Sequence, residues 1–222
     1  GFAVVLRVEL SDCTDSLRSI VILLKISKRY VLKIKTSMEF KILPVEQIIG
    51  NILSANQSEF LSLSPTMGIS YSWGDMFELS QWILAKDDEI SGLRAFNLPN
   101  KSKYPLIFMV TPIEGKIMQN ENLFEGITFI VACDTKAEWL NQTRETETMP
   151  MLTNVANKFI EVISKDKNAT ILRKDGILNV KFKKVYNYSV NKKENQTLDI
   201  WDAISLTFDL RINNNCLKNL KL

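Results

Sequence analysis

The chain has 222 residues, of which 45% are hydrophobic and 24% are charged, and its formal net charge is +3. This composition is typical of an ordinary folded protein and excludes an intrinsically disordered chain. The small charge gives no electrostatic support for a nucleic-acid-binding protein, which usually carries a strong basic excess on one face. Histidine is absent, so Ser-His-Asp and Cys-His nucleophile systems and histidine-ligated zinc are excluded.

The three cysteines, Cys13, Cys133 and Cys216, are far apart in the sequence and form no CxxC pair. We therefore expect no zinc site, no redox motif and no bound cofactor. Cys133 ends an apolar run and is predicted to be a small core residue. Glycine-rich phosphate-binding motifs are also missing from the sequence, so it offers no cradle for a nucleotide.

The first part of the chain has an irregular pattern. The apolar run 20–24 ends at Lys25 and is too short for a secretory signal or for a membrane span, which needs about 20 apolar residues. The alternation of Tyr30, Leu32 and Ile34 is compatible with a short strand.

The pattern becomes regular at Met38. Our hypothesis is that Met38 is the natural initiator and that residues 1–37 are an atypical lead-in outside the native domain. The alternative is a genuine N-terminal extension. The predicted domain then covers residues 38–216, and residues 217–222 form a C-terminal tail.

Two helices and a strand are predicted in the first half of this domain. Apolar residues recur at helical spacing from Val45 to Leu53, directly after Pro44, which predicts an amphipathic helix. The alternation over residues 69–73 predicts a half-buried strand. A capping pair, Asp75 and Glu78, then predicts a second helix.

This second helix is predicted to extend from Met76 to about Lys86, with an apolar face of Leu79, Trp82 and Ile83. The polar stretch 87–102 is predicted to be a connection.

The second half of the domain is richer in strands. The apolar runs 104–110 and 126–133 predict an antiparallel pair of strands. A long amphipathic helix is predicted from Met149 to Ile163, because apolar residues recur there at helical spacing. Asp175-Gly176 predicts a hairpin, and the strict alternation over 204–212 predicts a strand with one buried and one outward face.

This order of helices and strands predicts an α+β fold: a single domain with a mainly antiparallel sheet packed against two or three helices.

Three carboxylates near the last strand, Asp199, Asp202 and Asp209, could hold a metal ion only if they converged on one point. Asp202 and Asp209 are separated by an odd number of positions, which places them on opposite faces of an uninterrupted strand. Asp199 is expected before the strand. We therefore interpret all three as surface or turn acids, and a carboxylate-dependent nuclease remains the less favoured alternative.

The charged segment between residues 138 and 149 is the best candidate for a contact with another subunit. Trp139 is the favoured anchor within it, because tryptophan is common at interfaces. A solvated loop or helix start is the alternative. The outward face of the last strand adds two further candidates. The candidate interface residues are Glu138, Trp139, Arg144, Glu145, Glu147, Asp209 and Arg211.

Five lysines cluster in the sequence before this strand, at Lys181, Lys183, Lys184, Lys192 and Lys193. We interpret them as a solvated strand face, and a phosphate-binding patch is the alternative.

Several short stretches together resemble a family of small proteins from phage and prophage structural clusters of Bacteroidetes-type hosts. The similarity covers about Met38 to Cys216. The stretches are Leu43-Pro44-Val45, Lys103-Tyr104-Pro105-Leu106-Ile107, Asp134-Thr135-Lys136 leading through Glu138 and Arg144 to Pro150-Met151-Leu152, and Ile200-Trp201-Asp202-Ala203-Ile204.

The predicted element order is also similar to that of phage tail-terminator and tail-completion proteins. The resemblance implies a virion protein, assembled in the host cytoplasm, that forms a homo-oligomeric ring, often sixfold, and contacts tail-tube and connector proteins. It supplies no catalytic residue, so we expect a non-enzymatic tail terminator or head–tail joining subunit. We expect neither a membrane nor a specific nucleic-acid sequence as a partner. The alternative is a monomeric adaptor module that binds another protein.

Overall fold

The computed structural model describes residues 3–6, 22–25, 44–63, 68–95, 103–118, 121–193 and 196–213. The chain divides into two compact units, residues 1–41 with 216–222, and residues 42–215. In the first unit, β1 (Ala3–Leu6) pairs antiparallel with β2 (Ile22–Lys25). The predicted initiator Met38 and the predicted strand from Tyr30 to Ile34 lie outside the described residues.

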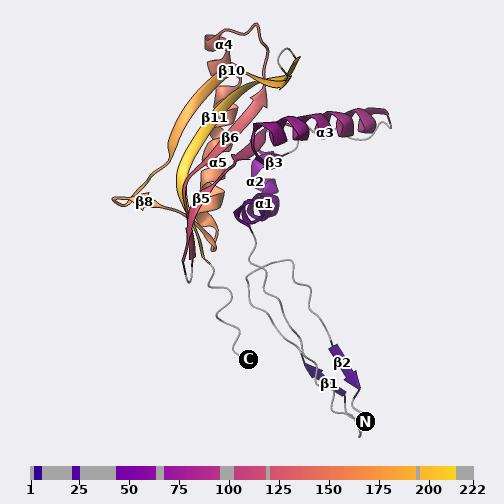
Figure 1. The fold of residues 1–222 in the computed structure, drawn as a ribbon, viewed down its shortest axis with the longest axis vertical. Helices are drawn as coiled ribbons and strands as arrows, with labels where there is room; N and C mark the ends of the chain where they lie inside the picture. The colour runs from indigo at the N-terminus through magenta and orange to yellow at the C-terminus, as the bar shows by residue number, and fades with distance from the viewer. Residues whose placement is uncertain are drawn as a thin grey trace. The chain divides into compact units, whose positions relative to one another are not determined.

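A mixed, mostly antiparallel sheet forms the second unit and confirms the predicted α+β fold (Figure 1). Its strands follow the order β10-β11-β6-β4-β3, and β5 and β7 extend it by pairing with β6 and β11. Only β3 and β4 are parallel among the pairs of this sheet that the structure describes. The bounds are β3 (Ser70–Gly74), β4 (Leu106–Val110), β5 (Glu114–Ile117), β6 (Glu121–Asp134), β7 (Ala169–Ile171), β10 (Lys181–Lys193) and β11 (Gln196–Asn213).

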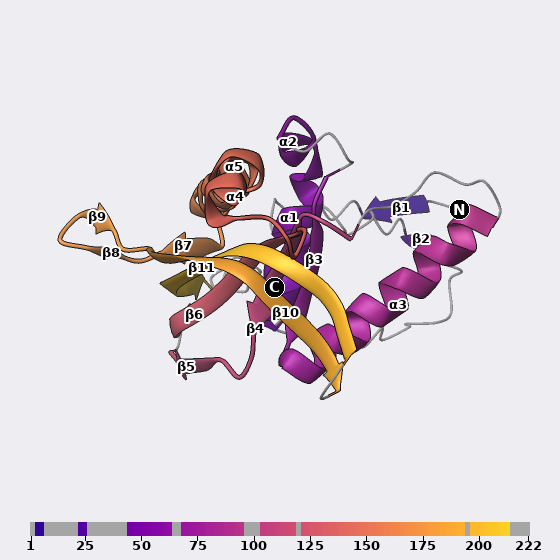
Figure 2. The ribbon, with the colours of Figure 1, turned by 90° about the horizontal axis from the view of Figure 1, so that it is seen from above.

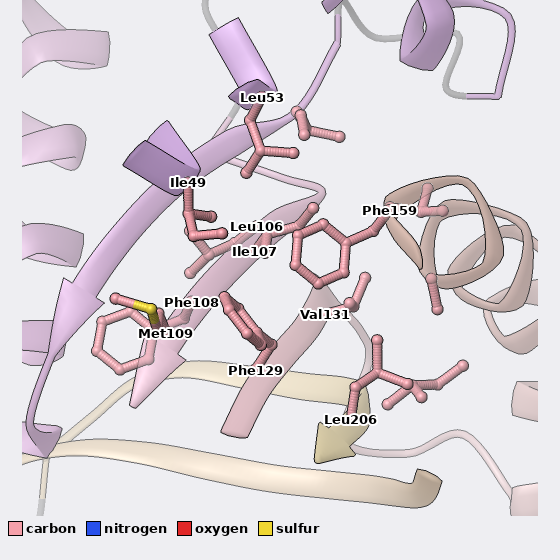
Figure 3. Packing of buried hydrophobic residues seen from close by; sticks show 14 of the residues in the cluster. Ile49, Leu53, Leu106, Ile107, Phe108, Met109, Phe129, Val131, Phe159 and Leu206 are labelled. Atoms are coloured by element: carbon pink, nitrogen blue, oxygen red, sulfur yellow. The ribbon is translucent and has the colours of Figure 1, made fainter. Parts of the chain in front are cut away.

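The core lies between one face of this sheet and the helices that cover it, α1 (Val45–Ala55), α2 (Gln57–Leu61) and α5 (Met149–Lys165) (Figure 2). Alternate residues of β6 and β11 point to this face, as the period of two in a strand requires. Phe129 of β6 stacks on Phe208 of β11, and Phe159 of α5 packs against both. Figure 3 shows Phe159 pointing from the helix toward Phe129.

Both helices predicted in the first half are present. Helix α1 begins at Val45 and buries four of the predicted apolar positions, Val45, Ile49, Ile52 and Leu53. Helix α3 (Met76–Ala95) has the predicted capping pair: Asp75 Oδ1 accepts from the Glu78 amide at 2.9 Å, and Glu78 Oε2 accepts from the Asp75 amide at 2.8 Å.

Helix α3 is longer than predicted, since it extends to Ala95. The prediction of a connection from Asp87 was therefore wrong for residues 87–95. The N-terminal half buries Leu79 and Ile83, whereas the C-terminal half runs away from the sheet (Figure 1). A helix that does not pack needs no apolar stripe, so periodicity gave no signal there.

The predicted pairing of β4 with β6 is confirmed as antiparallel. The predicted hairpin is also confirmed, as β8 (Arg173–Lys174) and β9 (Ile177–Leu178) pair across Asp175 and Gly176. Both turn residues have positive φ, 52° and 78°, as a type I′ turn requires. Cys133 is buried as predicted, and burial, followed by the charges of Asp202 and Asp134, raises its pKa to about 12.

Within the part of the chain that the structure describes, no helix is both long and apolar enough to cross a membrane.

Candidate assembly surfaces

The segment predicted to contact another subunit is mostly helical. After a loop at residues 135–140, α4 (Asn141–Glu147) continues through Thr148 into α5. Helix α4 lies at the N-terminal end of α5, while β7 and the β8–β9 hairpin follow its C-terminal end (Figure 1). The segment is therefore part of the folded domain.

Arg144 fastens this segment to the sheet. Its side chain is completely buried, and Nη1 lies 2.6 Å from Oδ1 of Asp202 in β11, which is also completely buried. The remaining guanidinium donors reach the preceding loop: Nη2 donates to the Lys136 carbonyl at 2.6 Å, and Nε donates to the Trp139 carbonyl at 3.0 Å. One side chain thus fixes both the loop and α4 against β11.

Asp202 completes the network from the other side. Its Oδ2 accepts from Thr148 Oγ1 at 2.7 Å, and its Oδ1 also accepts from the Asn187 amide of β10 at 3.2 Å. Burial alone would raise the pKa of Asp202, but hydrogen bonds from Thr148, Arg144 and Asn187 outweigh it and hold the pKa below its ordinary value. The carboxylate is therefore the charged partner of a buried ion pair.

Two interpretations from the sequence need correction here. Asp202 is not a surface acid, because it shares the phase of Ile204, Leu206 and Phe208 and so points to the covered face. The sequence contained the indication, because Asp202 occupies the same alternate positions as these three apolar residues. Arg144 lies inside the fold, so its effect on any neighbouring subunit is indirect, through the position of α4.

The other predicted contact residues of this segment reach the surface. Glu138 and Glu147 are exposed. Trp139 is half-buried, with Lys136 Nζ 5.4 Å from its ring centroid. Glu145 binds Lys184 of β10 at 2.7 Å; this hydrogen bond, followed by one from Tyr186, holds the pKa of Glu145 below its ordinary value.

Asp209 and Arg211 lie elsewhere. Asp209 Oδ1 accepts from the Gly126 amide at 2.7 Å, and Arg211 Nη1 lies 3.5 Å from Glu121 Oε2. Arg211 is ten positions beyond Trp201 on β11, or about 33 Å of strand, and Trp201 pairs with the end of β6 that leads to α4. The candidate interface residues of segment 138–147 and those of the last strand, Asp209 and Arg211, therefore lie far apart in the structure.

The three aspartates near the last strand, which we interpreted as surface or turn acids, each accept hydrogen bonds from protein groups. Asp199 lies within β11 rather than before it, since the strand begins at Gln196. Its Oδ2 accepts from Lys103 Nζ at 2.8 Å and from the Tyr104 hydroxyl. Burial, followed by this hydrogen bond, raises the pKa of Tyr104 above its ordinary value. Among the described residues no group of three or more Cys, Asp or Glu side chains could hold a metal ion.

A second surface, which the sequence did not single out, lies at the other end of α5. Large apolar side chains are exposed on the β8–β9 hairpin and on the start of β10: the exposed fraction is 73% for Ile177, 38% for Leu178 and 70% for Phe182. Arg173, Lys174 and Lys181, which are close to them in the sequence, are also exposed. We call these six residues the hairpin surface. The sequence pattern that could have indicated this surface is the Asp175-Gly176 turn, which is flanked by apolar and basic residues.

Strand β10 also forms an edge of the sheet, because β11 is its only described partner strand. Its 13 residues therefore present backbone donors and acceptors on their outer side, which can template pairing with another chain. A bulge at Asn187, whose φ is 52°, interrupts the edge. Such bulges limit open-ended strand addition.

Comparison with known proteins gave no match to a protein-family model, to a curated protein or to a solved structure.

Proposed function

We propose that this protein is a non-enzymatic structural subunit of a phage tail, a tail terminator or head–tail joining subunit, that works as a homo-oligomeric ring. The motifs that resemble phage structural proteins support the biological setting. The geometry supports the mode of action, which is association through surface contacts.

The observation that carries this proposal is the hairpin surface. Ile177 and Phe182 expose most of their side chains to solvent. Ile177 belongs to the β8–β9 hairpin, which projects from the sheet (Figure 2), and Phe182 lies at the start of β10. A single exposed apolar residue is normal on a protein surface, whereas several close together indicate a contact site; three large apolar residues are exposed within residues 177–182. A large aromatic such as Phe182 is well suited to anchor such a contact.

The proposed mechanism is geometric. A contact between two different surfaces of identical subunits produces a ring when the rotation between neighbours closes. A closed ring exposes no further contact of this kind at its rim, so it can end the growth of a tube on which it sits. The tube and connector proteins would then bind the two faces of the ring.

The test is native mass spectrometry of the purified full chain, with negative-stain microscopy of the same sample. We expect a closed oligomer of uniform size that associates with tail-tube protein. A chain that stays strictly monomeric at high concentration and ignores tube protein would overturn the proposal. A monomer that binds one unrelated protein through the hairpin surface would instead identify the alternative, a monomeric adaptor.

A further inference from the structure

We propose that the hairpin surface of one copy docks on the α4 end of the next copy. The α4 end is defined by Asp134, Glu138, Leu140 and Glu147. This inference rests on the proposed function, because it names the two surfaces through which the ring would close.

The two surfaces have opposite net charge. In the hairpin surface, the basic residues Arg173, Lys174 and Lys181 are exposed close in sequence to the apolar residues, and Asp175 is an exposed acid in the turn. At the α4 end the acids Asp134, Glu138 and Glu147 are exposed, and Lys136 of the same loop is exposed beside the Trp139 ring. Complementary charge of this kind selects the partner surface and suppresses contacts between like surfaces.

The α4 end also offers an apolar residue for Ile177 and Phe182 to cover. Leu140 is 74% exposed and lies between the acids Glu138 and Glu147 in the chain. Contacts of this kind, apolar at the centre and charged at the rim, are typical of interfaces between subunits.

The α4 end is held in one geometry before any contact forms. The buried guanidinium of Arg144 binds the carbonyls of Lys136 and Trp139, on either side of Glu138, and the helix that carries Glu147 includes Arg144 itself. A surface fixed in this way loses less conformational entropy when it binds. The buried ion pair of Arg144 and Asp202 would therefore act on the contact indirectly, by holding the loop and α4 in position.

The tip of the hairpin and α4 follow opposite ends of α5, so we infer that the tip of one copy meets the α4 end of another copy rather than its own. Helix α5 has 17 residues, so the tip of the hairpin and α4 are separated by about 25 Å of helix. Glu145 of α4, by contrast, already binds Lys184 of the same chain and is not counted in the α4 end.

A two-fold contact between two β10 edges is the main competing arrangement, because β11 is the only described partner strand of β10. The bulge at Asn187 interrupts this edge and limits its pairing with another chain. The head-to-tail contact, by contrast, builds a ring by repetition.

The experiment reverses the charge of each surface separately in the full chain. One variant carries K174E and K181E, and the other carries E138K and E147K. We expect each variant alone to associate roughly tenfold more weakly than the wild type, or worse, in sedimentation velocity. A 1:1 mixture should recover association, because the reversed hairpin of the first variant then faces the reversed α4 end of the second.

A control matched to the first variant carries K86E and K116E, which lower the net charge by the same amount as K174E with K181E but on α3 and β5, and should leave association unchanged. Recovery in the mixture also shows that both variants are folded. If the wild type forms a ring that neither reversal weakens, or if the mixture fails to recover, this inference is overturned while the proposed function stands. A monomeric wild type overturns both.

Discussion

The Arg144–Asp202 pair beneath α4 and the hairpin surface carry their charged residues in opposite ways. Arg144 and Asp202 are completely buried and bind each other and neighbouring groups. In the hairpin surface the charges are exposed, and so are the large apolar side chains of Ile177 and Phe182. The buried pair stabilises the fold of one chain, whereas the exposed apolar side chains of the hairpin surface would be buried only by binding a partner.

The largest effect is expected from Asp202→Ala. The variant leaves the Arg144 guanidinium buried without its counter-charge, which typically costs roughly 3–5 kcal/mol. Urea denaturation of the purified chain measures the loss. A loss below about 1 kcal/mol would mean that water reaches the pair and that α4 is not fastened by it.

A double variant, Arg144→Met with Asp202→Leu, should be milder than Asp202→Ala alone. It removes both charges together, so no buried charge is left unpaired, and it should be more stable than the single variant by about 1 kcal/mol or more. The same denaturation experiment measures this difference. If the double variant is less stable than Asp202→Ala, the hydrogen bonds to the Lys136 and Trp139 carbonyls matter more than the charge balance.

Acid should lower the stability of the fold through Asp202. The folded pKa of Asp202 lies below its ordinary value of 3.8, so the unfolded chain takes up this proton at a higher pH than the folded chain does. The stability from Asp202 is therefore fully present above its unfolded pKa and is lost as the pH falls through its folded pKa. Stability measured between neutral and acidic pH should fall more steeply in the wild type than in the double variant, which lacks this carboxylate. If the stability of the two proteins falls equally with pH, Asp202 does not contribute in its charged form as we infer.

Gly176→Ala should cost about 1 kcal/mol, because a residue with a side chain is strained at the φ of 78° that the turn requires. The strain is confined to the hairpin, so hydrogen exchange should rise in β8 and β9 while β6 and β11 stay protected. Association should weaken as well, since the hairpin surface loses its fixed shape. Val180→Ala, a substitution close to the hairpin that leaves the turn intact, is the control.

The smallest effect on stability is expected from Ile177→Ser with Phe182→Ser. Both side chains are mostly exposed in the folded chain, so the free energy of unfolding should change by about 0.5 kcal/mol or less. Association should nevertheless be lost, because the apolar centre of the proposed contact is gone. Denaturation and sedimentation velocity on the same sample separate the two effects. A large loss of stability would show that the hairpin surface packs on its own chain.

Local patterns in the sequence determined much of the fold. The stripes of α1 and α5, the Asp75–Glu78 cap, the Asp175-Gly176 turn and the alternation of β11 were each readable, because helix and strand periods and turn chemistry are properties of neighbouring residues. They were sufficient for the α+β class and for the pairing of β4 with β6. The C-terminal half of α3 had no such pattern, since it does not pack on the sheet.

The tertiary structure alone decided what the charged residues do. Arg144 and Asp202 are 58 positions apart, and no local rule pairs them; only the crossing of α4 over β11 turns two apparently surface charges into a buried pair. The same crossing left Glu138 and Glu147 outside. Exposure of Ile177 and Phe182 was equally a tertiary outcome, because whether an apolar residue on a strand is covered depends on what packs against it.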